Sequence, residues 1–228
     1  MSNPFDFDPR KKGPPLGISA YSFLNEQPKP VRRKVFISYH HADEREVLVF
    51  LAHFNPSGAT FIKRGLGAGM SEDIINSTNA DYIMGRIRRE YLGDSTVTIV
   101  LMGKCTWGRR YVDWEIQASL RQGEVYTPNG LIGIKLPSFG SGKYPERFNL
   151  NLRWPKDLDC FARVYGYPPN PETLRLWIED AHASRTKRAH LIRNPREDFK
   201  NDRRCCVTHH PSLVTGIPSL MQLPKNAR

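Results

Sequence analysis

The sequence predicts an α/β fold: a five-stranded parallel sheet of flavodoxin-like order 2-1-3-4-5 with helices on both faces. Two observations indicate it. Short runs of β-branched and aliphatic residues alternate with longer segments in which apolar residues recur every three or four positions. The run Thr96–Met102 is uncharged, as expected of a central strand covered on both faces. Such alternation implies right-handed crossovers between parallel strands, and this strand order is the economical choice.

The first predicted strand is Lys34–Tyr39, which is β-branched and aromatic. A helix is expected over Asp43–His53, because it starts with acidic residues and its apolar residues (Val47, Leu48, Leu51 and then Phe54) are three or four positions apart. The segment Asn55–Gly58 ends this helix, and Ala59–Lys63 is a weaker second strand. The glycine-rich stretch that follows does not match the dinucleotide-binding pattern, and we expect a flexible loop there.

A second helix is expected over Asn79–Tyr91, with Tyr82, Ile83, Ile87 and Tyr91 facing inward, before Gly93 and Asp94 stop it. The central strand Thr96–Met102 leads through a short loop into a helix over Arg109–Arg121.

Leu131–Leu136 and Cys160–Tyr165 are the fourth and fifth predicted strands, and the loop between them shows only turn signals. The last predicted helix is Pro171–Ala183. From Ser184 onward neither periodicity is sustained, so we expect a disordered or loosely held arm.

The net charge of +11 is confined to the ends of the chain. Residues 1–34 hold seven Lys and Arg against three Asp and Glu, residues 184–228 hold ten against three, and residues 35–183 hold 17 of each. The predicted organisation is a Pro-rich basic leader over residues 1–32, a folded domain over 33–183 and a basic tail over 184–228. A nucleic-acid partner is therefore not expected for the folded part, although the tails can make nonspecific contacts with polyanions.

Cys105, Cys160, Cys205 and Cys206 do not form the spacing of a disulfide framework, and we expect free thiols. Cys205 and Cys206 with His209 and His210 lack the separated pairs of a zinc site, so no metal is expected. No apolar run is long enough for a membrane helix and no signal peptide precedes the fold, which predicts a cytoplasmic protein.

The candidate for a chemical role is Glu115, in the helix that follows the third strand. Ligands of open α/β sheets collect at such strand ends. No nucleophile elbow or Walker A sequence is present. One carboxylate can hold ribose hydroxyls and stabilise an oxocarbenium-like sugar cation when an N-glycosidic bond breaks. The alternative is that Glu115 is an exposed helix acid, or one paired with the nearby Arg109 and Arg110.

Two segments resemble Toll/interleukin-1 receptor (TIR) domains: KVFISYHHADE at 34–44 and STVTIVLMGKCTWGRRYVDWEI at 95–116. The first is similar to the first-strand signature of that family. The second is similar to its third strand and following helix, with Tyr111 four residues before Glu115. The pattern fits best the bacterial TIR-like branch that includes the TIR protein of the Thoeris anti-phage system, and it covers residues 33–136 well.

The resemblance implies that Glu115 is the catalytic acid of an NAD+ glycohydrolase or cyclase that forms an ADP-ribose signal. It also implies self-association and an effector reached by that signal, with NAD+ as substrate and no cofactor. Ser38, Tyr39 and His40 would line the pocket near the nicotinamide ribose. The family's usual Trp-Cys pair before the Glu is replaced here by Tyr111-Val112, which leaves the details of substrate contact open.

Each of these positions also has a structural interpretation. Ser38 can satisfy backbone groups at a strand end, Tyr39 can belong to the core, and Trp107 can stack on a substrate ring or only cover its loop. Asp43 is expected to be an N-cap or first-turn acid. Arg109 and Arg110 lie at a helix start, where cations are unfavourable, which suggests contact with a diphosphate or an acidic partner surface. The whole domain can alternatively be a non-catalytic interaction module.

Overall fold

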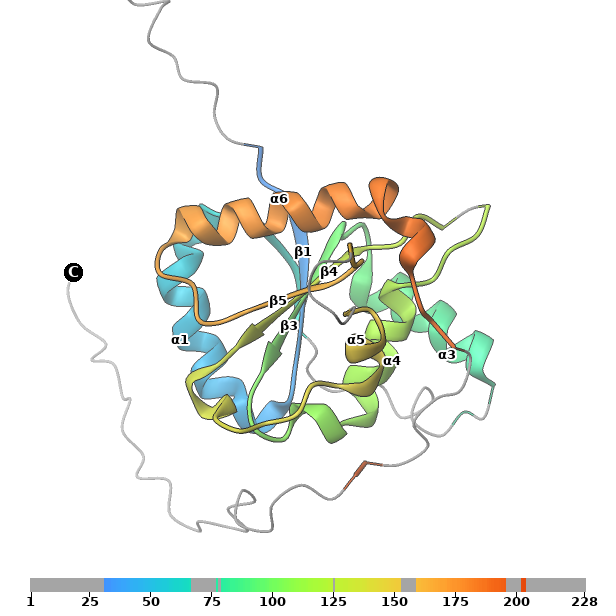
Figure 1. Cartoon of the computed structure of the whole chain (residues 1–228), viewed down its shortest axis with the longest axis horizontal. Helices are drawn as coiled ribbons and strands as arrows, with labels where there is room; N and C mark the ends of the chain where they lie inside the picture. Colours follow the sequence, from blue (N-terminus) through green and yellow to red (C-terminus); the bar gives the residue numbers. More distant parts are fainter. Residues whose placement is uncertain are drawn as a thin grey trace, which may run out of the picture. The chain divides into compact units, whose positions relative to one another are not determined.

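The computed structural model describes residues 31–66, 77, 79–124, 126–152, 159–195 and 202–203. The chain divides into two compact units, Met1–Val31 and Arg32–Arg228, and all that follows concerns the second. Its strands form one parallel sheet in the order β2-β1-β3-β4-β5. The predicted fold class and strand order are therefore confirmed (Figure 1).

The strands are β1 (Lys34–Tyr39), β2 (Ile62–Leu66), β3 (Val97–Met102), β4 (Gly130–Lys135) and β5 (Arg163–Tyr165). The main helices are α1 (Glu44–Phe54), α3 (Ala80–Arg86), α4 (Arg110–Ser119), α5 (Glu146–Leu150) and α6 (Pro171–Lys187). A π-helical stretch, η4 (Ile87–Leu92), continues α3 directly. Short 3-10 turns complete the described elements: η2 (His41–Asp43), η3 (Pro56–Gly58), η5 (Thr106–Gly108), η6 (Pro137–Phe139) and η7 (Ala189–Leu191).

Side-chain alternation along the strands separates the core into two layers, because successive residues of a strand point to opposite faces of the sheet. Val35, Ile37 and Tyr39 of β1 pack with residues of α1 and α6 on one face. Phe36 of the same strand packs on the other face, against α3, η4 and α4. Figure 1 shows α1 and α6 on one side of the strands and α3, α4 and α5 on the other.

Strand β3 is the centre of the sheet, since it pairs with β1 on one side and β4 on the other. All six of its residues are buried, as its uncharged sequence predicted. Its register places Ser38 of β1 opposite Val100. Because the strands are parallel, the ends of β1, β3 and β4 and the loops that follow them lie along one edge of the sheet.

Gly130 allows α6 to lie directly on the start of β4. A Cβ atom at this position would stand 1.8 Å from the carbonyl oxygen of Ala181 in α6. Since a backbone atom cannot move aside as a flexible side chain can, any larger residue would push the helix off the sheet.

Two predictions about helices are corrected. The segment between β4 and β5, expected to hold only turns, contains α5, which at five residues is too short to show a periodic pattern. Helix α6 runs to Lys187, four residues beyond its predicted end at Ala183. Leu191 and Ile192 then pack against the α4 and α5 side of the sheet, so the expectation of an unstructured arm from Ser184 is wrong for residues 184–195. Most of the remaining arm lies outside the described residues.

Two apolar residues predicted to face inward are exposed. Tyr82 of α3 is 41% exposed and Leu48 of α1 is 54% exposed. Each is adjacent in sequence to a buried residue of its helix, Val47 or Ile83, and therefore points about 100° away from it, out of the covered face. The glycine-rich loop lies outside the described residues from Gly67 onward. In the described part of the chain, no helix combines the length and apolarity that crossing a membrane requires.

Candidate active site

Glu115 is buried between α4 and β1. Its side chain is on the face of α4 that packs against the sheet, and the residue is only 2% exposed. The hydroxyl of Ser38, near the end of β1, donates a hydrogen bond of 2.6 Å to the Glu115 Oε2 atom. Ser38 faces α4 because it alternates with Ile37 and Tyr39, which face α1. The alternative of an exposed or ion-paired helix acid is therefore wrong for Glu115 within the described structure.

Burial raises the pKa of the Glu115 carboxyl group to about 8, and the hydrogen bond from Ser38 opposes this by favouring the charged form. Removal from water dominates, since the ionised form loses its hydration. The carboxyl group is thus mostly protonated at pH 7 and close to its titration midpoint. A carboxyl group held in this state can exchange a proton, or become charged when a cation binds beside it.

The residues after Ser38 divide between the two faces of the sheet. The ring of Tyr39 packs in the core formed with α1 and α6, on the face opposite Glu115. Burial first, and then the charges of Glu44 and Glu115, raise the pKa of its phenol. His40 is 5% exposed, and its ring meets that of His41 edge to face with centroids 4.2 Å apart.

Asp43 connects the loop after β1 to the loop after β3 through a hydrogen bond. It occupies the N-cap position of α1, but its side chain makes no capping hydrogen bond there. Its Oδ2 atom instead accepts a 3.0 Å hydrogen bond from the hydroxyl of Thr106, which accepts one from the amide of Gly103. A Cβ atom on Gly103 would lie 2.3 Å from the Asp43 carboxylate, so this close approach requires glycine. Asp43 is thus an N-cap residue by position and a first-turn acid of η2, as predicted, but its carboxylate contacts Thr106 and does not cap α1.

Trp107 and Tyr111 have described contacts other than Glu115. The Nζ atom of Lys143, from the loop after β4, lies 5.3 Å from the ring centroid of half-buried Trp107. Tyr111 packs edge to face against Trp114, and its hydroxyl accepts a hydrogen bond from Arg110. The structure thus brings Ser38 to Glu115 directly, whereas the contacts described for Trp107 and Tyr111 are with Lys143, Trp114 and Arg110.

The two arginines at the start of α4 have partners within the chain. Arg109 forms an ion pair with Asp202 at 3.4 Å, and the backbone amide of Arg110 donates a 2.8 Å hydrogen bond to the same carboxylate. The backbone amide of Arg203 bonds to the carbonyl of Gly108 at 2.8 Å. An acid of the same chain, Asp202, thus lies against these arginines and also satisfies a free amide of the helix start. The predicted contact with a diphosphate or an acidic partner surface stays a prediction.

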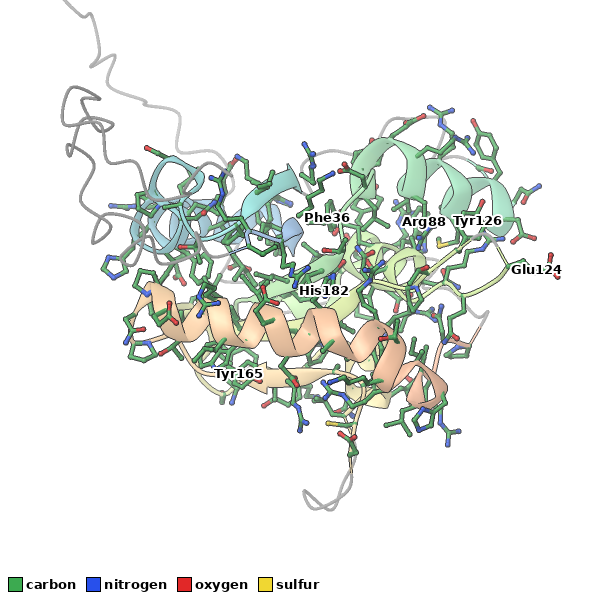
Figure 2. The ribbon with its side chains drawn as sticks, turned by 90° about the horizontal axis from the view of Figure 1, so that it is seen from above. Phe36, Arg88, Glu124, Tyr126, Tyr165 and His182 are labelled. Atoms are coloured by element: carbon green, nitrogen blue, oxygen red, sulfur yellow. The ribbon has the colours of Figure 1, made fainter. Side chains whose placement is uncertain are left out.

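The other end of α4 is held by Arg88, which lies in η4. Its guanidinium group donates hydrogen bonds to the carbonyls of Ala118 and Thr127 and lies over the ring of Tyr126, 5.0 Å from its centroid. Arg88 and Tyr126 are adjacent in Figure 2. The helix bearing Glu115 is thus fixed at both ends by side chains from other parts of the chain.

Sequence reasoning missed three groups near the site. They are the Asp43–Thr106 contact, the buried pair of Asp113 and Arg147, and Asp202. No periodic signal marks them, because each joins side chains at least 34 positions apart.

The predictions on thiols and metals have different outcomes. Cys105, in the loop after β3, is disulfide-bonded, so the expectation that all four cysteines are free is wrong. Cys160 is a free, buried thiol. In the described ranges, no cluster of His, Cys, Asp or Glu is suited to a metal ion. The segment with Cys205, Cys206, His209 and His210 lies outside those ranges.

Residues 36–140 match the family model of the Thoeris protein ThsB, TIR-like domain. The matched segment contains Ser38, the loop after β3 and Glu115. This segment of the chain is similar to TIR-like domains. The chain is also similar to the Bacillus cereus (strain MSX-D12) protein named "Putative cyclic ADP-D-ribose synthase ThsB1". The two are 28% identical over 151 residues, which cover 64% of this chain and 70% of the relative.

Proposed function

We propose that this protein cleaves NAD+ at the bond between nicotinamide and ribose and forms an ADP-ribose or cyclic ADP-ribose signal in anti-phage defence. The observation that carries the proposal is Glu115, a carboxyl group buried beside Ser38 with its pKa raised to about 8. It lies in the segment that matches the TIR-like family model. The name of the Bacillus cereus relative agrees with the cyclising form of this reaction.

The chemistry needs one anionic group near the ribose. As the C1′–N bond breaks, its electron pair moves to the nicotinamide nitrogen, the pyridinium becomes neutral, and positive charge develops on the ribose ring. The Glu115 carboxylate would hold the ribose hydroxyls and stabilise that charge in a site that excludes water. Water then attacks C1′ and loses a proton, giving ADP-ribose. In the cyclising reaction a nucleophilic atom of the same ADP-ribose attacks C1′ instead.

The raised pKa of Glu115 fits a substrate that is itself cationic. In the free protein the acid is mainly neutral at pH 7, which avoids an uncompensated buried charge. A nicotinamide ring brings a positive charge beside it and favours the carboxylate, so the acid would ionise when the substrate binds. Ser38 supports the ionised form through its hydrogen bond.

The proposed partners follow from the same function. NAD+ is the substrate, with no separate cofactor. The TIR-like domains would associate with one another, and an effector protein would receive the nucleotide signal. The proposed place of action is the cytoplasm, where NAD+ is available.

The direct test incubates the purified full chain with NAD+, with and without a crowding agent that promotes self-association, and follows nicotinamide by chromatography. Wild type is expected to release nicotinamide and Glu115→Gln is not. A matched control is Glu124→Gln, because Glu124 is exposed in the loop after α4 (Figure 2) and should retain activity. Absence of nicotinamide under every condition, or equal release by Glu115→Gln, would reject the enzyme function.

A second candidate function is a non-catalytic TIR-like interaction module. It is favoured by Leu48 and Val49, adjacent apolar residues of α1 that are 54% and 58% exposed. The discriminating experiment measures protection from phage in cells. If Glu115→Gln protects as well as wild type while substitutions in the loop Gly65–Ser71 abolish protection, the interaction module is correct.

A further inference from the structure

The face of α4 turned away from Glu115 carries a buried ion pair. The guanidinium group of Arg147 in α5 binds the carboxylate of Asp113 through two hydrogen bonds of 3.0 Å, from Nε to Oδ1 and from Nη2 to Oδ2. Both side chains are 3% exposed. Two parallel bonds of this kind restrict orientation as well as distance, because the guanidinium and the carboxylate must be coplanar.

The pair is held in place by the segment that follows α6. The Nη1 atom of Arg147 donates hydrogen bonds to the side-chain oxygen of Asn194 and to the carbonyl of Pro195. Asn194 in turn donates a 3.0 Å hydrogen bond to the backbone carbonyl of Gln117, in the next turn of α4. Asn151 bonds to the carbonyl groups of Arg147 and Arg193. Two successive turns of α4 are thus connected to α5 and to residues 193–195.

These contacts lie opposite Glu115 on the helix. Asp113 and Gln117 are four residues apart and share one face, and Glu115, midway between them, projects about 180° from the centre of that face. We propose that Asp113 and Arg147 are positioning residues that hold α4 in the rotation that keeps the Glu115 carboxyl group against Ser38. Of this inference, only the expected effect on catalysis rests on the proposed function.

A small rotation of the helix would be enough to separate the two groups. Side-chain atoms lie about 5 to 6 Å from a helix axis, so a turn of about 20° moves such an atom by about 2 Å. That displacement would break the 2.6 Å hydrogen bond between Ser38 and Glu115. The apolar contacts of Val112 and Ile116 with the sheet tolerate such a shift better than hydrogen bonds do, since hydrophobic burial is non-directional. The ion pair adds the orientation that apolar packing does not define.

The test uses the full chain and four variants. Arg147→Met breaks the pair and Arg147→Lys keeps the charge. The double variant Asp113→Asn with Arg147→Met removes both charges, so no buried charge is left unpaired and the protein should remain folded. Arg175→Met is the matched control, because it removes the exposed pair with Glu172 on α6.

The first readout is the titration of the Glu115 carboxyl carbon by NMR with labelled glutamate, assigned with Glu115→Gln. In the double variant and in Arg147→Met, Glu115 should lose the hydrogen bond from Ser38 that favours its charged form, so its titration midpoint is expected to rise by about one pH unit. The titration midpoint of Glu115 should shift less in Arg147→Lys than in Arg147→Met, and in Arg175→Met it should match that of wild type. The second readout is NAD+ cleavage, where the double variant should lose kcat by about tenfold or more with KM little changed.

A purely structural role would give a different pattern. If the double variant is folded and its Glu115 midpoint lies within about 0.3 pH units of wild type, the positioning role is overturned, whatever the change in stability. A raised midpoint in the double variant of a protein that shows no NAD+ cleavage supports the positioning role and rejects only the proposed enzyme function. The experiment can therefore reject the positioning role and the proposed enzyme function independently of each other.

Discussion

Replacing Glu115 by glutamine should change how stability depends on pH. Burial raises the pKa of this group from 4.5 in the unfolded chain to about 8 in the folded protein. Between these values the folded protein binds more protons than the unfolded chain, so stability is greatest below pH 4.5 and falls as pH rises toward 8. Glutamine retains the shape of the neutral acid and does not titrate. The variant therefore lacks the fall in stability that ionisation of Glu115 causes as pH rises.

The size of the effect follows from the two pKa values. Each pH unit between them is worth about 1.4 kcal/mol, so the wild type loses about 1 kcal/mol by pH 5, about 3 kcal/mol by pH 7 and about 5 kcal/mol by pH 9 from this group alone. The difference in unfolding free energy between Glu115→Gln and wild type should therefore grow by about 4 kcal/mol from pH 5 to pH 9. Other titrating groups are common to both proteins and cancel in the difference.

The assay is urea unfolding of both proteins at pH 5, 6, 7, 8 and 9, followed by circular dichroism. A difference that stays constant across this range would mean that Glu115 titrates with an ordinary pKa in the folded protein. A difference that changes in the opposite direction would mean that the folded protein stabilises its charged form. Either result would refute the assignment of Glu115 as a neutral buried acid near its titration midpoint.

Three further substitutions test the surroundings of the site. Ser38→Ala removes the hydrogen bond to the charged form of Glu115 and should raise the pKa of that acid by about one further unit, seen as an upward shift of its NMR titration. Thr106→Val breaks the link to Asp43 and should lower the unfolding free energy by about 2 kcal/mol in urea, with slower nicotinamide release. Gly130→Ala drives a Cβ atom into the backbone of α6 and should cost about 3 kcal/mol in the same assay.

Each of these substitutions has a matched control elsewhere in the chain. Ser184→Ala changes a buried serine of α6 and should leave the Glu115 titration unchanged. Thr186→Val changes an exposed threonine and should alter stability by less than about 0.5 kcal/mol. Gly166→Ala places a Cβ atom in open space, so it should be tolerated. Equal effects of a substitution and its control would remove the specific role assigned to that contact.

Much of the fold was predictable because hydrophobic periodicity records which faces of an element are buried. The run Thr96–Met102 reads as a central strand and is one, with six buried residues over Val97–Met102. The alternation of strands and helices implies parallel pairing, and the observed strand order agrees. The predictions of secondary structure failed where hydrophobic periodicity carries little information. Helix α5 has only five residues, and at the end of α6 polar residues continue the helix to Lys187.

For the candidate site, the sequence alone determined that Glu115 lies on the helix that follows the central strand. The tertiary structure decided that this acid is buried, and that its partner is Ser38, 77 positions earlier. It also decided that Asp113, two residues before Glu115, pairs with Arg147 on the opposite face of the helix. The physical reason is that apolar patterns specify which face is covered, whereas a polar contact depends on two distant elements packing in one register and rotation.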